Sequence, residues 1–266
     1  MFTVIGERIN TTRKPVRQAV EARDAAFIQA DVKRQQDAGA HYIDVNAGAR
    51  VGREREDMEW LLDVIQEEVS IPLCLDSPDP RVLEAAYERV ERPPLINSIS
   101  LEKERLNNLI PFLRGKDCGV VALCMDDSGL PKDADEVLDR ARQLVEKLEG
   151  IGMPRHRIYI DPLVQPVSTR TEHGPQAITA VRKIMTELEG VHTVCGLSNV
   201  SFGLPKRRAV NRAFLSLMMA AGLDAAILDP LDASLMATLI TSNMLLGRDE
   251  YCMDYIDAVR DGRIAD

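Results

Sequence analysis

Short hydrophobic runs alternate along the chain with longer amphipathic segments. The runs are rich in Val, Ile and Leu and occupy residues 2–6, 41–47, 72–77, 94–98, 119–125, 157–161, 192–198 and 223–229. Continuous hydrophobic runs of this length are typical of strands that are buried on both faces, as in a parallel sheet. We therefore predict a strand at each of these positions.

The segments between the runs predict helices. Residues 53–69 carry acidic and amide side chains on one helical face and a hydrophobic stripe on the other, formed by Met58, Leu61, Leu62, Ile65 and Val69. Similar periodicity marks residues 22–38, 80–90, 101–114, 135–149, 174–189, 207–221 and 232–246, and a last helix is expected at 250–261.

Eight predicted strands thus alternate with eight predicted helices, and a terminal helix follows. A parallel sheet with one crossover per strand is either an open doubly wound sheet or a closed barrel. Eight such units in 266 residues favour the α/β class and a (β/α)₈ TIM barrel. No Pro/Gly/Ser-rich linker divides the chain, so we expect a single domain over residues 1–266.

Charge and hydropathy narrow the environment in which this chain works. The net charge of -9 disfavours a nucleic-acid partner, and only residues 205–208 are locally basic. The longest hydrophobic stretch, 216–231, is interrupted by Asp224 and Asp229, so it falls short of the ~18 apolar residues that a membrane span needs. The N-terminus lacks the basic start and hydrophobic core of a signal peptide. We expect a cytoplasmic protein.

The cysteines and histidines give little support for a metal site. Cys74, Cys124 and Cys195 lie inside hydrophobic runs and are expected to be core residues in a reducing compartment. The chain has no CxxC or HExxH pattern, and its histidines are scattered at positions 41, 156, 173 and 192. We therefore expect no metal ligands.

Polar side chains end several hydrophobic runs, namely Asp76, Asn97, Asp161, Ser198, Asn199 and Asp229. In a TIM barrel the residues that follow each strand converge on one mouth, where the active site lies. Carboxylates and carboxamides without a histidine suit a planar heterocycle with several N–H donors and a few acceptors. An Asp or Asn at a strand end can instead cap the next helix or form a turn, and Asp229, before Pro-Leu-Asp, is the best candidate for a cap.

Eight short motifs give this pattern a specific resemblance. In order along the chain they are GERIN (6–10), DVNAG (44–48), LCLDS (73–77), INS (96–98), MDDSGLPKD (125–133), YIDPL (159–163), GLSNVS (196–201) and NRAFL (211–215). The series resembles the pterin-binding methyltetrahydrofolate methyltransferases, and most closely the branch that exchanges a methyl group with a separate corrinoid protein. The resemblance spans nearly the whole chain.

The resemblance implies a site at the barrel mouth. Asp76, Asn97 and Asp161 match the family's pterin-binding triad, and Asn199 matches the asparagine near N5 of the folate. The exit loops of the first two strands and the seventh would complete the shell with Glu7, Asn10, Asp44, Asn46 and Ser198.

Two further positions concern the folate tail. Arg207 is similar to a family arginine near the benzoyl-glutamate end, although a solvated charge at a helix start is the alternative. Several relatives carry a polar amide where this chain has Phe202. Phe202 can stack on the benzoyl ring or pack its loop against the barrel.

The implied reaction moves a methyl group between N5 of tetrahydrofolate or 5-methyltetrahydrofolate and the cobalt of a corrinoid (cobalamin). A methyl amine is a poor donor unless its nitrogen gains a proton. Asn199 can accept a hydrogen bond from N5–H⁺, and the proton can arrive through Asp161 or a bound water, so these two residues are the candidate catalytic groups. The chain carries no DxHxxG corrinoid motif, so a partner protein must bring the corrinoid to the barrel mouth.

Three other expectations accompany this interpretation. A dihydropteroate synthase is one alternative function, but DVNAG stands where that family has DxGGxS. A catalytically silent pterin-binding subunit of a methyltransferase complex is another. The resemblance also implies a homodimer, and residues 216–227 and 237–246 carry hydrophobic surface that a partner subunit or simple core packing would cover.

Overall fold

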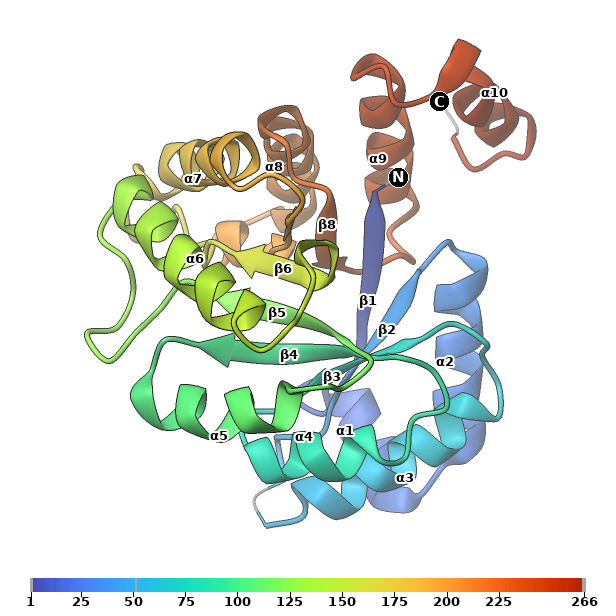
Figure 1. The fold of residues 1–266 in the computed structure, drawn as a ribbon. Coiled ribbons are helices and arrows are strands. Elements are labelled where there is room, and N and C mark those ends of the chain that lie inside the picture. Colours follow the sequence, from blue (N-terminus) through green and yellow to red (C-terminus); the bar gives the residue numbers. More distant parts are fainter. Residues whose placement is uncertain (1, 51, 265–266) are drawn as a thin grey trace.

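A single eight-stranded parallel sheet forms the centre of the computed structural model, which describes residues 2–50 and 52–264. Its strands follow the order β7-β6-β5-β4-β3-β2-β1-β8, and helices surround it (Figure 1). The strand bounds are β1 Thr3–Asn10, β2 Tyr42–Asn46, β3 Leu73–Asp76, β4 Leu95–Ser100, β5 Gly119–Leu123, β6 Ile158–Asp161, β7 His192–Thr193 and β8 Ala225–Leu228.

The helices follow the strands in alternation. They are α1 Lys14–Ala22, α2 Ala25–Asp37, α3 Glu54–Gln66, α4 Pro80–Tyr87, α5 Lys103–Leu113, α6 Ala134–Glu149, α7 His173–Glu187, α8 Arg207–Ala221, α9 Ala233–Leu245 and α10 Met253–Arg260. Short 3₁₀ helices lie at η1 Arg155–Arg157, η2 Leu197–Ser201 and η3 Glu250–Cys252.

The sheet comes close to closing on itself. Between β7 and β8 the ring is joined by a parallel bridge from Gly196 to Ile227, with the Ile227 N–H donating to the Cys195 carbonyl at 2.9 Å. This confirms the predicted single-domain (β/α)₈ barrel.

Two hydrophobic layers stabilise the barrel. The larger lies between the outer face of the sheet and the helices. The smaller fills the inside of the barrel with Ile5, Cys74, Leu95, Val121, Tyr159, Val194 and Ala225. Because side chains alternate across a strand, the residue two positions further along each of these strands also points inward, but nearer the carboxyl end. Cys74, Cys124 and Cys195 are buried free thiols, as predicted.

The first helical region differs from the prediction of one helix at 22–38. Arg23 adopts a left-handed conformation (φ 53°) that ends α1, and the Asp24 side chain accepts a hydrogen bond from the Phe27 N–H to begin α2. The helix at 14–22 was therefore missed and the start of the next was placed too early.

Strand lengths also differ from the prediction. β1 extends to Asn10, with a register shift between Gly6 and Ile9 where it pairs with β2. β7 contains only two residues, and the rest of the predicted run at 192–198 turns into η2. The exit loops of β1 and β7 consequently begin at different places from those expected.

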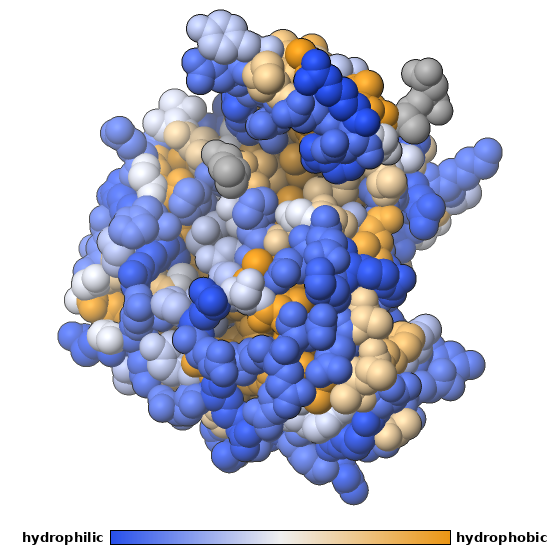
Figure 2. Space-filling model, turned by 90° about the vertical axis from the view of Figure 1, so that its right-hand side faces the viewer, coloured by the Kyte–Doolittle hydropathy of each residue, from blue (hydrophilic) through white to orange (hydrophobic). Residues whose placement is uncertain are grey.

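The surface shown in Figure 2 is largely hydrophilic, with hydrophobic side chains visible in a central hollow and also at the top and along the right-hand side of the view. Helix α10 lies at the edge of the molecule beside the C-terminal end of α9 (Figure 1). No helix within the described residues is long and apolar enough to span a membrane.

Candidate active site

Polar residues of four neighbouring strands lie at one level near the carboxyl end of the barrel. The register pairs Asn10 of β1 with Asn46 of β2, Asn46 with Asp76 of β3, and Asp76 with Asn97 of β4. The Asn46 Nδ2 donates to Asp76 Oδ2 at 2.8 Å. Parallel pairing therefore brings together residues from four separate motifs, as the sequence predicted. All four residues lie within the bounds of their strands and not in exit loops.

Asp44 lies one layer deeper than this row. It is almost fully buried in β2, and the Asn97 Nδ2 lies 3.5 Å from its Oδ1. Burial, and then the charge of Asp76, raise the pKa of the Asp44 carboxyl well above its usual range. Asp44 is thus part of the barrel interior beneath the mouth, where it contacts Asn97, and the predicted exit-loop position is wrong.

The surroundings of Asp76 shift its pKa in opposite directions. Burial raises its pKa, while the hydrogen bond from Asn46 and the charge of Arg105 act to lower it. Arg105 of α5 donates to the carbonyls of Ser77 at 3.0 Å and Ser98 at 2.7 Å. It therefore fixes the ends of β3 and β4 together. Sequence reasoning missed Arg105, which looks like any polar residue of an amphipathic helix.

Asp161 ends β6 and is 9% exposed. Its Oδ1 accepts a hydrogen bond from the Leu163 N–H at 2.7 Å, an arrangement reached with Leu163 at a φ of 64°. Burial raises the pKa of Asp161 to about 7, and the single backbone hydrogen bond lowers it only in part. This carboxyl group can therefore hold a proton near neutral pH.

A cavity lies on the other side of the mouth, between β1, β8 and the start of α8. Glu7, Ser198, Arg207, Asn211 and Asp229 are among its lining residues. Burial, and then the charge of Asp229, raise the pKa of Glu7 to about 7. The site thus contains a second carboxyl group that titrates near neutrality.

Ser198 and Asn199 lie in η2. The Asn199 side chain is exposed, and neither η2 nor α8 is capped by a side-chain hydrogen bond. Helix α4 is capped by Asp79, so Asp76 is not a cap either. Asp76 and Asn199 therefore do not cap the helices that follow them, and each keeps polar atoms available to a ligand.

Turn formation and ligand binding are compatible at other positions. One side-chain oxygen of Asn10, Asn46, Asp161 or Asp229 accepts a hydrogen bond from the N–H two residues further on, at 2.9, 3.0, 2.7 and 3.0 Å respectively. The second polar atom of Asn10 and Asp161 lies beyond that bond, whereas the second atom of Asn46 donates to Asp76 and that of Asp229 accepts from Arg8. Asp229 forms this turn, whereas Asp232 caps α9.

The two predicted tail residues lie beside each other. Phe202 is 65% exposed, so it does not pack its loop against the barrel. The guanidinium carbon of Arg207 lies 5.9 Å from the Phe202 ring centroid. Arg207 also donates to Ser201 Oγ at 3.0 Å and to the Ser198 carbonyl at 2.6 Å, so it is anchored to η2 and not simply a solvated charge.

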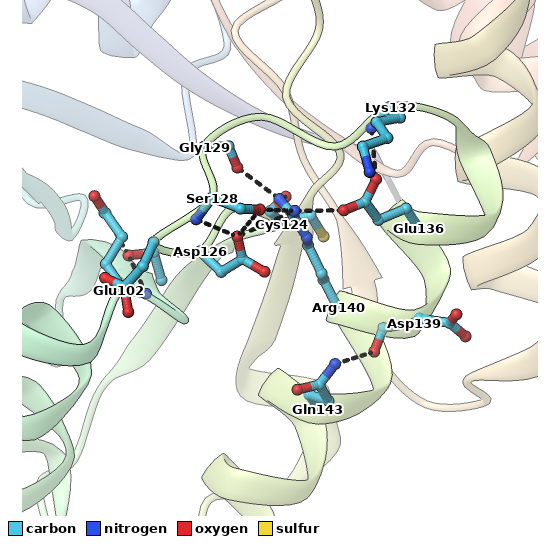
Figure 3. A network of polar contacts seen from close by, with 12 residues as sticks. Glu102, Cys124, Asp126, Ser128, Gly129, Lys132, Glu136, Asp139, Arg140 and Gln143 are labelled. Atoms are coloured by element: carbon cyan, nitrogen blue, oxygen red, sulfur yellow. Dashed lines mark hydrogen bonds and ion pairs between the residues drawn. The ribbon is translucent and has the colours of Figure 1, made fainter.

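The MDDSGLPKD segment after β5 is held by a buried arginine of α6 (Figure 3). Arg140, only 2% exposed, donates to the Gly129 carbonyl at 2.6 Å and pairs with Asp126 at 3.1 Å and Glu136 at 2.5 Å. The Arg140 side chain therefore fixes the conformation of this loop, although no sequence motif indicated that role. Among the described residues no cluster of three or more His, Cys, Asp or Glu could hold a metal ion.

Carboxylates and carboxamides at the mouth of a parallel barrel suit a polar heterocycle that offers several N–H donors. The family model for pterin binding enzymes matches residues 6–229. The chain therefore belongs to the pterin-binding enzyme family, which confirms the resemblance predicted from the eight motifs.

Two relatives indicate the branch of the family. The chain is 36% identical over 263 residues to a methylcorrinoid:tetrahydrofolate methyltransferase of Eubacterium limosum, covering 98% of this chain and 97% of the relative. It is 32% identical over 238 residues to the methionine synthase of Mycobacterium tuberculosis, covering 84% of this chain but only 20% of that much longer protein. The chain is a methyltransferase of this family.

Solved structures share the fold. A dihydropteroate synthase of Xanthomonas albilineans with 4-aminobenzoic acid matches with a TM-score of 0.67 and 22% identity, covering 93% of each chain. The same enzyme in complex with 7,8-dihydropteroate matches with a TM-score of 0.65 and 20% identity, covering 93% of this chain and 92% of that one. At these identities the likeness concerns the barrel alone.

The raised pKa of Asp161 predicts a pH-dependent stability difference. A carboxyl group with a pKa of about 7 in the folded chain and an ordinary value of 3.8 binds a proton on folding at pH values between the two. It therefore lowers the free energy of unfolding as pH rises through this window. Asp161→Asn removes the ionisable group and keeps an oxygen for the Leu163 N–H. We expect the variant to gain stability over the natural chain as pH rises from about 4 to about 8. Urea unfolding at several pH values measures this, and a difference that stays constant with pH would contradict it.

Proposed function

We propose that this methyltransferase moves a methyl group between N5 of tetrahydrofolate and the cobalt of a corrinoid carried by a separate protein. The observation that carries the proposal is the row of Asn46, Asp76 and Asn97, with Asp161 on β6, at the mouth of a chain that matches a methylcorrinoid:tetrahydrofolate methyltransferase over nearly its whole length. The net charge of -9 supports a small-molecule substrate over a nucleic acid. We expect the protein to act in the cytoplasm.

The chemistry of the mouth suits a reduced pterin. The aminopyrimidine edge offers several N–H donors. The carboxylates of Asp76 and Asp161 would accept hydrogen bonds from them, while the Asn97 carboxamide can both donate and accept. Glu7, Asn10, Asp44, Asn46 and Ser198 complete the proposed shell, with Asp44 acting from beneath through Asn97. Arg207 and Phe202 lie together where a benzoyl-glutamate tail would meet a cation and an aromatic face.

Transfer from N5 requires that nitrogen to gain a proton before or during the reaction. The carboxamide of Asn199 cannot titrate, but its oxygen can accept a hydrogen bond from N5–H⁺ and favour the protonated form. Asp161, with a pKa of about 7, can hold the proton that is delivered, and Glu7, also at about 7, is a second source. When docked over the mouth, the partner's corrinoid supplies the nucleophilic cobalt, or the methyl group in the reverse direction.

A direct test uses the absorbance of the corrinoid. Free cobalamin as Co(I) or methyl-Co(III) would be mixed with the protein and with methyltetrahydrofolate or tetrahydrofolate. Conversion between the two cobalt states supports methyl transfer. If the protein binds folate but converts neither free cobalamin nor a protein-bound corrinoid, the result would favour a silent pterin-binding subunit. Condensation of a pterin with p-aminobenzoate would favour dihydropteroate synthase chemistry.

The pterin assignment of Asp76 predicts a loss of affinity. Asp76→Ala would leave a ligand N–H desolvated without an acceptor, which costs about 1 to 3 kcal/mol, or about one to two decades in Kd. Titration calorimetry with methyltetrahydrofolate measures this, with the surface variant Asp139→Ala as the matched control. Unchanged affinity in Asp76→Ala would remove Asp76 from the pterin site.

The proposed role of Asn199 predicts a loss of rate. If Asn199 stabilises the protonated N5 that develops during transfer, Asn199→Ala should slow single-turnover transfer by about 10² to 10³. Folate affinity should fall much less, since the interaction strengthens in the transition state. Asn107→Ala, an exposed asparagine of α5, is the control. A lowered melting temperature with an unchanged rate would show that Asn199 is structural.

A homodimer remains part of the proposal. In the two predicted stretches, Leu217 of α8 is 55% exposed and Leu245 of α9 is 76% exposed, and further exposed hydrophobic side chains follow at Leu246, Tyr251, Met253, Ile256 and Val259. Core packing therefore does not account for all of this hydrophobic surface, and a second subunit would cover it.

We expect sedimentation at micromolar concentration to give about twice the chain mass of 29.6 kDa. Leu245→Glu should shift the protein toward the monomer because it places a charge in the proposed interface, whereas Leu130→Glu on the β5–α6 loop should not. A natural protein that sediments as one chain would rule the homodimer out.

A further inference from the structure

Arg8 occupies the middle of the GERIN motif but is not part of the proposed pterin shell. It connects three elements: its Nε donates to Asp31 Oδ1 at 2.9 Å, its Nη2 to Asp31 Oδ2 at 2.8 Å, and its Nη1 to Asp229 Oδ2 at 2.9 Å. Asp31 belongs to α2 and Asp229 follows β8. Arg8 therefore ties the first strand of the barrel to the last, across 221 residues of sequence.

The Asp31 end of this connection is rigid. The Asp31 side chain is 3% exposed, and it also accepts hydrogen bonds from Arg34 at 3.0 Å and Gln35 at 2.9 Å. Gly6 allows this close packing, because a Cβ at that position would lie 2.3 Å from Gln35 Oε1. With the acceptor held on both sides, the bidentate pair fixes the plane of the Arg8 guanidinium.

The Asp229 end faces the active site. Asp229 Oδ1 accepts from the Leu231 N–H at 3.0 Å while Oδ2 accepts from Arg8, so both carboxylate oxygens are held. Asp229 and Glu7 line the same cavity at the mouth. The register shift between Gly6 and Ile9 lies at this point of β1, where Glu7 lines the cavity and Arg8 reaches α2.

We propose that Arg8 is a positioning residue of the methyltransferase: anchored on Asp31, it holds the Asp229 carboxylate in the wall of the cavity that Glu7 lines, and so sets the negative charge beside the Glu7 carboxyl. This inference rests on the proposed function, and it assigns a role to the Gly-Glu-Arg part of the motif. Gly6 allows α2 to pack closely, Glu7 lines the cavity, and Arg8 holds Asp229 in the wall of the same cavity.

The electrostatics of the cavity agree with this role. After burial, the charge of Asp229 raises the pKa of Glu7, while the charges of Arg13, Arg207 and Arg8 lower it. Asp232 lines the same cavity and lies 3.4 Å from Arg208. Weakening the hold of Arg8 on Asp229 lets this carboxylate move away from Glu7, so the pKa of Glu7 should fall, as it should when Asp229 is neutralised.

A set of three variants tests the assignment. Arg8→Lys keeps the charge but loses the planar fork that binds Asp31 and Asp229 together. Asp229→Asn removes the charge beside Glu7 and keeps one oxygen, which can accept from Arg8 or from the Leu231 N–H but not from both. Arg34→Gln is the matched control, because Arg34 pairs with the same Asp31 but its side chain is 60% exposed and does not contact Asp229.

The measurements are single-turnover methyl transfer to free Co(I) cobalamin at saturating methyltetrahydrofolate from about pH 5.5 to about pH 8.5, folate affinity, and the melting temperature. We expect Arg8→Lys to slow transfer on the order of 10- to 100-fold with a smaller change in affinity. The pH midpoints of Arg8→Lys and of Asp229→Asn should both move downward. Arg34→Gln should match the natural chain in rate and midpoint.

Two results would overturn the assignment. One is an Arg8→Lys variant that melts at a lower temperature but transfers with the natural rate and pH midpoint, as a purely structural clamp would. The other is a midpoint of Asp229→Asn that does not move downward, a result available even if Arg8→Lys fails to fold. Failure of the proposed function is seen separately, because the natural chain would then transfer no methyl group, and the role of Arg8 would fall with it.

Discussion

Four carboxyl groups at and beneath the barrel mouth are partly or fully shielded from water, and the site depends on how the protein compensates for that shielding. Burial is the largest cause of the raised pKa of Glu7, Asp44, Asp76 and Asp161. An isolated buried carboxylate is costly, so such groups are paired, hydrogen-bonded or protonated. Here Asn46 donates to Asp76 and the Leu163 N–H donates to Asp161. The remaining acceptor capacity is what a donor-rich heterocycle can use.

Arginines outside the mouth hold its walls in place. Arg105 joins the ends of β3 and β4, Arg140 orders the loop after β5, and Arg8 ties β1 to α2 and β8. Each uses several donors of one planar guanidinium to fix more than one element. A site assembled from many strand ends needs such links, because its residues come from segments that are otherwise joined only through the barrel.

The shared barrel does not by itself distinguish the reactions of the family. Dihydropteroate synthases resemble this chain closely in fold at 20 to 22% identity. The distinction lies in side chains at the strand ends, where this chain has DVNAG after β2 begins and the GLSNVS turn that exposes Asn199. Function in such a fold is decided by the site, and the raised pKa of Glu7 and Asp161 fits the proton delivery proposed above.

The barrel, the family and the row of polar strand ends were predictable from the chain alone, because hydrophobic periodicity and short motifs are local properties. Asp76, Asn97 and Asp161 were identifiable since each directly follows or ends a hydrophobic run. The position of Asp44 beneath Asn97 became visible only in the tertiary structure. The same is true of the short β7, which has two residues. It alone revealed Arg8 and Arg140 as anchors, because their partners become neighbours only when the ring of strands closes and the helices pack against it.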